Sequence, residues 1–398
     1  MLGHLLPQAE AWLIPPGSSQ LHLVDAVGQI GVLPLVGVTG AQVDIGMLRR
    51  HSGTAARIGL GGLIVPLSAG IAIGYAVPAA FVPHLTSRTV FAALLGVAMA
   101  ASAIPVIAKV LADLKLTHRN VGQLILSACA LDDTAAWFLL SLVSAMATVG
   151  LRAGRIALSL AMLTGFVLAA VLVLGPMGRA VMRHTAGRGD AGPAVAAAAV
   201  FILLCAVITQ ALGFEAIFGA FVGGVLLSSP GGASPARLEP LRTVVLAVLV
   251  PVFLATAGLR VDLGVLARPD VLLWALILLT VATMSKFGGA YVSARISRLP
   301  HWESLAIGAG INARGVVEVV IAAVSLRLGV IGTTTYTIII LIAIATSVMA
   351  PPLLRLTMAR VEIKDGGGRA PGRPEGLAGP GPGGIPAMRE RSPARCHG

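Results

Sequence analysis

The chain has 398 residues, of which 56% are hydrophobic and only 12% are charged, and its formal net charge is +12. Hydrophobic runs long enough to cross a bilayer core of roughly 30 Å recur from residue 23 to residue 354, which argues against a soluble protein. Lys and Arg are scattered over loops and the C-terminal tail, and aromatic residues are only 4%, so nucleic acid is not an expected partner. The composition predicts an all-α polytopic membrane protein without a separate soluble domain.

Eleven membrane spans are predicted from the hydrophobic runs and from the alternation of loop charge. The runs on either side of Leu212 and Gly213 are treated as two spans, because merging them would destroy that alternation. The predicted spans lie near residues 23–40, 58–82, 88–112, 120–149, 154–177, 192–211, 213–229, 241–258, 269–292, 302–325 and 331–354.

The basic residues of the loops set the predicted orientation. Every second loop is rich in Lys and Arg, the opposite loops carry fewer, and the stretch before the first span carries none, so the N-terminus is expected outside the cytoplasmic membrane and the C-terminus inside. The expected parts are an extracytoplasmic segment at 1–22, a transmembrane domain at 23–354 and a basic cytoplasmic tail at 355–398. The tail is rich in Gly and Pro and too poor in apolar residues to form a core, so we expect it to be disordered; a solvated extension is favoured over contact with anionic lipid.

Two of the spans contain signals for a broken helix. Pro105, with Ser102 nearby, lies in the middle of the third span, where proline removes a backbone donor and clashes with the preceding turn. The tenth span contains Asn312, Arg314 and Glu318 among glycines in GAGINARGVVEVV. Arg314 and Glu318 are four residues apart and can share a helix face, so a structural ion pair is favoured over direct ion binding.

These two interruptions predict an inverted repeat. Each lies in the middle of a group of three spans, and the two core units are expected at about 58–149 and 269–354. An odd number of spans separates equivalent members, so the units run in opposite senses through the membrane. Transporters with inverted repeats bind their substrates where such discontinuous helices meet.

The most informative side chains are Asp132 and Asp133, adjacent acids inside the apolar fourth span. A charge at the centre of a bilayer costs roughly 2.5 to 3.5 kcal/mol on insertion scales, so intramembrane acids usually handle ions or protons. Lys286 lies about two and a half turns inside the ninth span. A buried partner for one of the acids is favoured for Lys286 over snorkelling to the interface.

Motifs for other chemistries are missing from the sequence. Cys129, Cys205 and Cys396 have no CxxC or Cys/His spacing and are assigned to packing or chance. HExxH, GxSxG, GxxxxGK[ST] and GxGxxG are absent in a suitable context, so an enzyme is not expected, and no cofactor is expected either.

The motifs ASAIPVIAKVLADLKL, LDDTAAWFLL, GFEAIFGAFVGGVLLS, PVFLATAGLRVDL and INARGVVEVV occur in this order. From about residue 21 to residue 354 the chain resembles the monovalent cation/proton antiporter family of bacterial sodium/proton exchangers. The resemblance implies an inverted-repeat antiporter fold with two discontinuous crossing helices, in which a core domain moves against a dimerisation domain to give alternating access. By the same match, Asp133 resembles the ion and proton carrier and Asp132 the neighbour that pairs with Lys286. The double acid with this lysine is associated with electrogenic exchange, and Arg314 and Glu318 match a motif with a mainly structural role.

The front of the chain departs from the family. Members of this kind usually have thirteen spans, whereas this sequence begins at MLGHLLPQAEAWLIPP, as if partway through the turn after the second helix. We expect two helices to be missing, through a misassigned start or a truncation. The family dimerises through that region, so a homodimer is expected if the front helices are present.

The predicted mechanism is competition between H⁺ and Na⁺ or K⁺ at Asp133 and Asp132. Adjacent helical residues point about 100° apart, so one acid is expected to face the ion cavity and the other the lysine. Ser102, Thr134 and the backbone carbonyls freed at Pro105 are candidate neutral ligands for the cation. Two rivals stay open: a sodium-coupled organic-anion symporter on the same scaffold, which needs a larger cavity and anion contacts, and a membrane protein that has lost transport.

Overall fold

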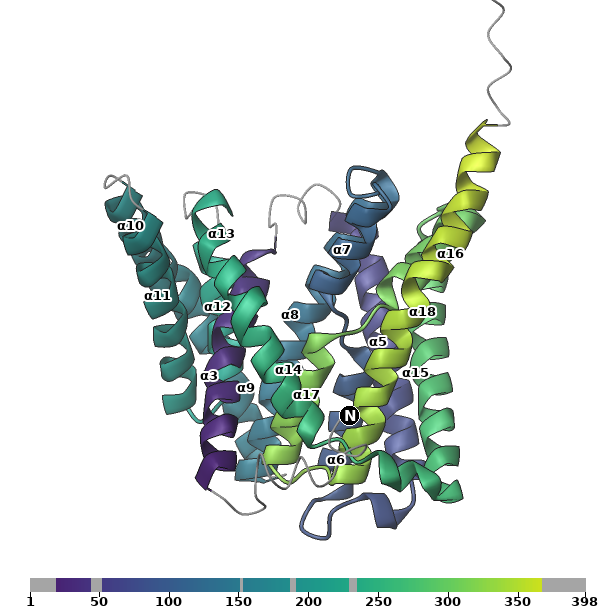
Figure 1. The fold of residues 1–398 in the computed structure, drawn as a ribbon, viewed down its shortest axis with the longest axis horizontal. Coiled ribbons are helices and arrows are strands. Elements are labelled where there is room, and N and C mark those ends of the chain that lie inside the picture. The colour runs from purple at the N-terminus through teal and green to yellow at the C-terminus, as the bar shows by residue number, and fades with distance from the viewer. Residues whose placement is uncertain (1–18, 44–51, 151–152, 187–190, 229–234, 367–398) are drawn as a thin grey trace, which may run out of the picture.

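The computed structural model describes residues 19–43, 52–150, 153–186, 191–228 and 235–366. Most of the predicted segment 1–22 and most of the predicted tail 355–398 lie outside these ranges. Within them, every regular element is a helix (Figure 1). The long helices are α3 (Ser19–Ala41), α5 (Ser52–Ala76), α6 (Arg88–Ala100), α7 (Ile104–Asp113), α8 (Asn120–Val149), α9 (Ala153–Ala169), α10 (Gly175–Ala186), α11 (Ala191–Ala211), α12 (Ala216–Leu227), α13 (Pro235–Val244), α14 (Val250–Leu259), α15 (Pro269–Ile296), α16 (His301–Ile311), α17 (Val316–Arg327) and α18 (Thr333–Gly366). Short 3₁₀ turns lie at Ala79–Phe81 and Leu263–Ala267, and π-helical turns at Ala170–Leu174 and Val245–Leu249 join α9 to α10 and α13 to α14.

The described residues contain eight helices that are long and apolar enough to cross a membrane, or nine with the bent pair α16 and α17. Two further predicted spans correspond to the shorter apolar stretches Gly31–Ala41 and Ala216–Leu227, so the count of eleven is not confirmed. The separation at Gly213 is present: α11 ends at Ala211, Gly213 has a φ of +83°, and α12 begins at Ala216.

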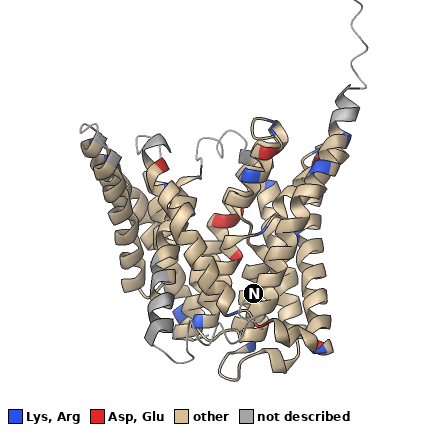
Figure 2. Ribbon diagram, viewed as in Figure 1, with Lys and Arg blue, Asp and Glu red and all other residues tan. Residues whose placement is uncertain are grey.

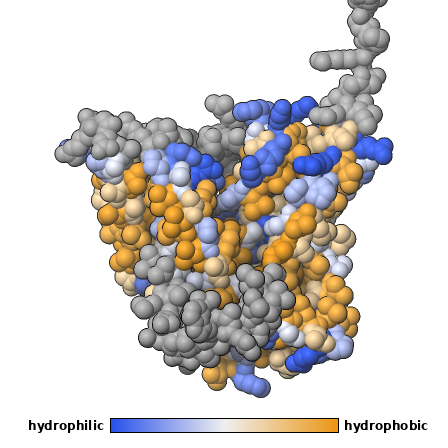
Figure 3. Space-filling model, viewed as in Figure 1, coloured by the Kyte–Doolittle hydropathy of each residue, from blue (hydrophilic) through white to orange (hydrophobic). Residues whose placement is uncertain are grey.

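The surface agrees with a membrane-spanning body. Figure 3 shows a broad apolar band across the visible face, with hydrophilic residues concentrated toward the two ends of the molecule. Figure 2 shows the same separation by charge, with most Lys, Arg, Asp and Glu residues near the helix ends and few in the middle. The few charged residues at mid-height therefore mark the place where a functional site is expected.

The helices form two groups that lie side by side in Figure 1. The first group consists of α3 and α9 to α14, in which α12 packs against α3 and α11. The second consists of α5 to α8 and α15 to α18, in which α5 packs against α6, α8 and α15. The predicted core units 58–149 and 269–354 both fall in the second group, although the division of the chain into these domains stays a prediction.

Small residues let the helices of each group approach closely. A Cβ added to Gly289 would lie 2.3 Å from the carbonyl oxygen of Gly61, where α15 crosses α5. A Cβ added to Gly224 would lie 1.9 Å from the carbonyl oxygen of Gly37, where α12 crosses α3. Association of helices in lipid depends on such close packing, because apolar side chains gain little by leaving apolar lipid.

The two predicted breaks are present and cross each other. Residues 101–103 separate α6 from α7, and residues 312–315 separate α16 from α17, which are bent by 41°. The two broken helices run in opposite directions in Figure 1. A Cβ added to Gly315 would lie 2.6 Å from Cγ2 of Val106, so the start of α17 contacts the start of α7. This arrangement is the fold of two discontinuous crossing helices that the sequence predicted.

The role of Pro105 differs from the prediction in one respect. Pro105 does not interrupt a continuing helix; it lies in the first turn of α7, after an extended stretch in which Ala101 has a ψ of 150° and Ala103 a ψ of 94°. A proline at that position loses no helical hydrogen bond, because the first N–H groups of a helix have no intrahelical acceptor. Pro105 therefore starts the second half-helix rather than kinking the first.

Candidate functional site

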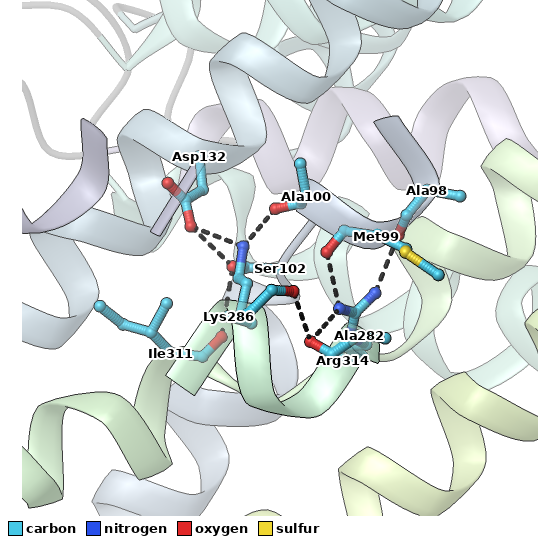
Figure 4. A network of polar contacts seen from close by, with 10 residues as sticks. Ala98, Met99, Ala100, Ser102, Asp132, Ala282, Lys286, Ile311 and Arg314 are labelled. Carbon is cyan, nitrogen blue, oxygen red and sulfur yellow. Dashed lines mark hydrogen bonds and ion pairs between the residues drawn. The ribbon is translucent and has the colours of Figure 1, made fainter. Parts of the chain in front are cut away.

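The centre of the site is a fully buried ion pair between α8 and α15. Nζ of Lys286 lies 2.8 Å from Oδ2 of Asp132, and both side chains are fully buried (Figure 4). Lys286 also donates a hydrogen bond to the carbonyl oxygen of Ala100, the last residue of α6. Lys286 therefore does not snorkel to the surface. Its ammonium lies where α6 ends, next to the first acid.

Ser102 links this ion pair to both helix breaks. Its hydroxyl lies 2.9 Å from Oδ2 of Asp132 and 3.4 Å from the carbonyl oxygen of Ile311, the last residue of α16. A hydroxyl carries one proton, so it donates to one of these acceptors at a time, and the shorter contact to the carboxylate is the stronger. Asp132 thus contacts Ser102 in the first break, and Ser102 in turn contacts the last residue of α16, where the second break begins.

Arg314 caps the end of α6 from the second break. Its guanidinium donates to the carbonyl oxygens of Ala98 at 2.9 Å, Met99 at 2.6 Å and Ala282 at 3.3 Å. The last carbonyls of a helix lack intrahelical donors and carry the negative end of the helix dipole, so a buried guanidinium stabilises them. The carbonyls of Ala98, Met99 and Ala100 are therefore held by Arg314 and Lys286, so these three are not free for a transported cation.

The predicted ion pair between Arg314 and Glu318 is not formed. Glu318 accepts a hydrogen bond of 2.7 Å from the backbone N–H of Gly315 through Oε2, so it caps the start of α17. The physical reason is the break itself: Arg314 precedes the first residue of α17, so the two residues do not lie on one continuous helix and the spacing of four does not bring them together. Each side chain instead satisfies the end of a different half-helix.

Asp133 differs from its neighbour in having no hydrogen-bond partner. Among the described residues, both of its carboxylate oxygens are buried and unpartnered, as are Oε1 of Glu318 and both side-chain amide atoms of Asn312. Asp133 lies near the backbone N–H of Ile104, the first residue of α7, and the other charges that act on it include Glu318 and Lys286. A buried ionised carboxylate without a partner is strongly disfavoured, so this group requires either a proton or a cation.

Thr134 is not part of this network. Its hydroxyl donates to the carbonyl oxygen of Ala130 at 2.7 Å, and its side chain is exposed on α8. A rotation of about 100° per residue turns it away from the buried face that carries the acids. Its predicted role as a cation ligand is therefore not supported by its position.

The described residues offer neither a cluster of metal-ligating side chains nor paired cysteines. They include no group of three or more His, Cys, Asp or Glu side chains that could hold a metal ion. Cys129 and Cys205 are buried and free.

Sequence reasoning missed Glu215. This residue precedes α12, and its buried carboxylate accepts from the Ser144 hydroxyl at 3.0 Å and forms an ion pair of 2.7 Å with Arg327 at the end of α17. It lines a cavity of about 820 Å³ together with Thr148, Gln210 and other residues of both helix groups. The sequence signal for it is a single carboxylate in the apolar stretch GFEAIFGAF.

Comparison with known proteins finds relatives that are named as cation/proton antiporters. A family model described as "Sodium/hydrogen exchanger, transmembrane" matches residues 2–360. The Na⁺/H⁺ antiporter NhaS4 of Synechocystis sp. is 30% identical over 363 residues, which are 89% of this chain and 86% of that protein. Cation/H⁺ antiporter 18 of Arabidopsis thaliana is 30% identical over 362 residues, and this chain spans less than half of the length of such plant relatives.

The solved structure of the sodium proton antiporter MjNhaP1 from Methanocaldococcus jannaschii has a similar fold. The TM-score is 0.62 at 17% identity, and the match covers 87% of this chain and 88% of that one. At this identity the likeness supports the fold alone. The family model, in contrast, covers nearly the whole described body, including both helix breaks and the acid pair. The chain therefore belongs to the family of transmembrane sodium/hydrogen exchangers.

Proposed function

We propose that this protein exchanges a monovalent cation, Na⁺ or K⁺, for protons across the cytoplasmic membrane by alternating access. The observation that carries the proposal is the contrast between two adjacent buried acids: Asp132 is paired with Lys286, whereas Asp133 has no partner. An unpartnered buried carboxylate is stable when it holds either a proton or a cation, and exchange needs a group that holds one or the other. The names of the relatives, which include Na⁺/H⁺ and K⁺/H⁺ antiporters, support the same cargo.

The proposed cycle begins with a proton on Asp133. On the side where the proton concentration is low, Asp133 releases its proton and the cation binds to its carboxylate, with the Ser102 hydroxyl oxygen as a neutral ligand. The loaded group of helices then moves and exposes the site to the other membrane face, where the cation leaves and a proton returns. Asp133 never holds both ions, so the two fluxes are coupled.

Lys286 gives this cycle a second proton. When the cation also draws Asp132 away from Lys286, the ammonium loses its counter-ion and releases a proton from Nζ. Two protons then move against one cation, and one net positive charge crosses the membrane per cycle. Such electrogenic exchange is driven by the membrane potential, by about 2.3 kcal/mol per charge for each 100 mV. The N-terminus is proposed to lie outside and the C-terminus in the cytoplasm, and a homodimer stays a prediction from the family resemblance.

Transport in proteoliposomes tests this function. A pH-sensitive dye reports proton movement after Na⁺ or K⁺ is added, and Asp133→Asn is expected to abolish it. Asp113→Asn is a matched control, because Asp113 is an exposed acid on α7 whose partner Lys109 lies on the same helix. Wild-type rates in the Asp133→Asn variant would refute the proposed site, and a strict need for an added organic anion would favour the symporter.

A further inference from the structure

A second polar cluster joins the two helix groups at one end of the molecule. Glu215 belongs to the first group, because it immediately precedes α12. Its two partners belong to the second group: Ser144 lies on α8, the helix of the acid pair, and Arg327 lies at the end of α17, the second half of a broken helix. One carboxylate thus holds two helices of the opposite group.

The carboxylate of Glu215 does not serve its own helix. Although Glu215 occupies the N-cap position of α12, its side chain accepts no hydrogen bond from the N–H groups of that helix. Oε1 faces Ser144 at 3.0 Å and Oε2 faces Arg327 at 2.7 Å instead. An acid at the N-cap position usually caps its own helix. The carboxylate of Glu215 instead contacts residues of the second helix group.

The pair differs from four other ion pairs of the described residues. Lys109–Asp113 and Arg242–Glu239 each lie on one helix, Arg268–Asp270 lies at the start of α15, and Lys286–Asp132 lies within the second group. Arg327–Glu215 is the one among them that joins the two groups. Its carboxylate is only 8% exposed and its guanidinium 41% exposed, so it is partly shielded from the screening that weakens exposed pairs.

Two other polar contacts between the groups do not involve α8 or α17. The Tyr336 hydroxyl donates to the carbonyl oxygen of Ala257 at 2.8 Å, and the Thr337 hydroxyl accepts from the Asp262 N–H at 3.1 Å. The Thr337 contact joins α18 to the connection between α14 and α15, where the chain itself links the groups, and the Tyr336 contact joins α18 to the last turn of α14, next to that connection. Glu215 instead bridges the start of α12 to α8 and α17, on the wall of a cavity of about 820 Å³ that residues of both groups line.

We propose that Glu215 is a positioning residue for the exchange reaction, which holds α8 and α17 against α12 in the arrangement seen here. The helices it holds carry Asp133 and the residue that caps the second break, so any movement of the acid pair relative to α12 requires these two contacts to break. The strength of the Glu215 contacts then sets how much of the protein is in this arrangement. The consequence for transport rests on the proposed function; the effect on the position of the helix groups does not.

Distances between the two groups test the inference without any transport measurement. Spin labels at Leu85→Cys and Leu212→Cys report the separation at this end: both side chains are exposed, Leu212 follows α11, and Leu85 neighbours Thr86, which bonds the carbonyl of Gly329 just beyond α17. Cys396 is replaced by serine, and Cys129 and Cys205 are buried. Pulsed electron paramagnetic resonance on the full chain in nanodiscs gives the distribution of distances between the two labels for each variant.

For the unaltered Glu215 we expect one dominant distance. Glu215→Gln keeps the shape of the side chain but removes its charge. The population at any second distance, relative to the population at the first, is expected to rise about tenfold, which corresponds to about 1.4 kcal/mol. Arg327→Gln is expected to act in the same direction, and the exchange of charges in Glu215→Arg with Arg327→Glu is expected to restore the original distribution. Arg268→Gln is the matched control, because it breaks an exposed pair at the same end within a single helix group.

Two results would overturn the inference. One is a Glu215→Gln distribution that superimposes on those of the unaltered protein and of Arg268→Gln. The other is a fall in thermal stability in both Glu215→Gln and Arg327→Gln without any change of distance, which is the result for a merely structural pair. Absence of cation-dependent proton movement in the unaltered protein would instead refute the proposed function and leave the distance test in force.

Discussion

Lys286 and Asp132 lie 154 positions apart in the sequence, and their Nζ and Oδ2 atoms are 2.8 Å apart in the interior. The contact fixes α15, at its middle, to α8. Ser102, in the first break, donates a hydrogen bond to the same carboxylate. Asp132 is thus held by two partners, Lys286 and Ser102, whereas neither carboxylate oxygen of Asp133 has a hydrogen-bond partner. On the proposed function, the first acid organises the site and the second carries the cargo.

Lys286→Met is expected to destabilise the protein strongly. It leaves Asp132 buried without its counter-ion, and breaking a buried pair typically costs about 3–5 kcal/mol. Asp132→Asn added to Lys286→Met is expected to recover much of this loss, because it removes the remaining charge. Thermal unfolding in detergent measures both, with Lys109→Met in an exposed pair on α7 as the control. Equal stability of Lys286→Met and Lys109→Met would show that the buried pair is not formed.

Arg314→Lys is not expected to be a conservative change. A lysine ammonium cannot reproduce the forked donation to the carbonyls of Ala98 and Met99, so at least one buried carbonyl at the end of α6 loses its donor. A lost donor to a buried group costs about 1–3 kcal/mol. Thermal unfolding should show that loss, and Arg355→Lys, an exposed position on α18, should not. A variant as stable as the parent would argue that Arg314 does not cap α6.

Gly289→Ala is expected to disrupt the packing of α15 on α5. The new Cβ would lie 2.3 Å from the carbonyl oxygen of Gly61, a backbone atom that can move only with its helix. Overpacking of this kind costs about 1–3 kcal/mol or more. Gly288→Ala is the matched control on the next residue, where a Cβ meets nothing within 4 Å. The yield of folded protein from membranes should fall for the first and not for the second; similar yields would contradict the close approach.

Ser102→Ala is expected to weaken cation binding without abolishing exchange. The hydroxyl is a neutral oxygen beside Asp132, and a hydrogen bond to a charged group is worth about 1.5–3 kcal/mol, so the apparent KM for the cation should rise about tenfold or more. Thr134→Val should leave the KM unchanged, because the Thr134 hydroxyl bonds its own helix. If Thr134→Val raised the KM as much as Ser102→Ala, the assignment of these two hydroxyls would be wrong.

Much of this architecture follows from local sequence signals. Length and hydropathy predict the long helices, and proline and glycine within apolar runs predict both breaks, because these residues are unfavourable inside a helix. The pairing of Lys286 with an acid was predicted from energetics alone, since a lone buried ammonium is costly.

The misses have a common cause in tertiary placement. The spacing of Arg314 and Glu318 predicts a contact only on a continuous helix, and α17 begins at Val316, after Arg314. The orientation of Thr134 depends on which face of α8 packs inward, and the partners of Glu215 lie on α8 and α17, far away in sequence. Such long-range contacts leave no local pattern to interpret.

Release of protons on cation binding tests the central claim most directly. When Na⁺ or K⁺ is added to purified protein in weakly buffered detergent, a cation that displaces the proton of Asp133 should release about one proton or more per chain, because carboxylate ligands must be deprotonated to bind. The Asp133→Asn variant should release none, while Asp113→Asn should behave like the unaltered protein. Equal proton release from the Asp133→Asn variant and the unaltered protein would contradict the account.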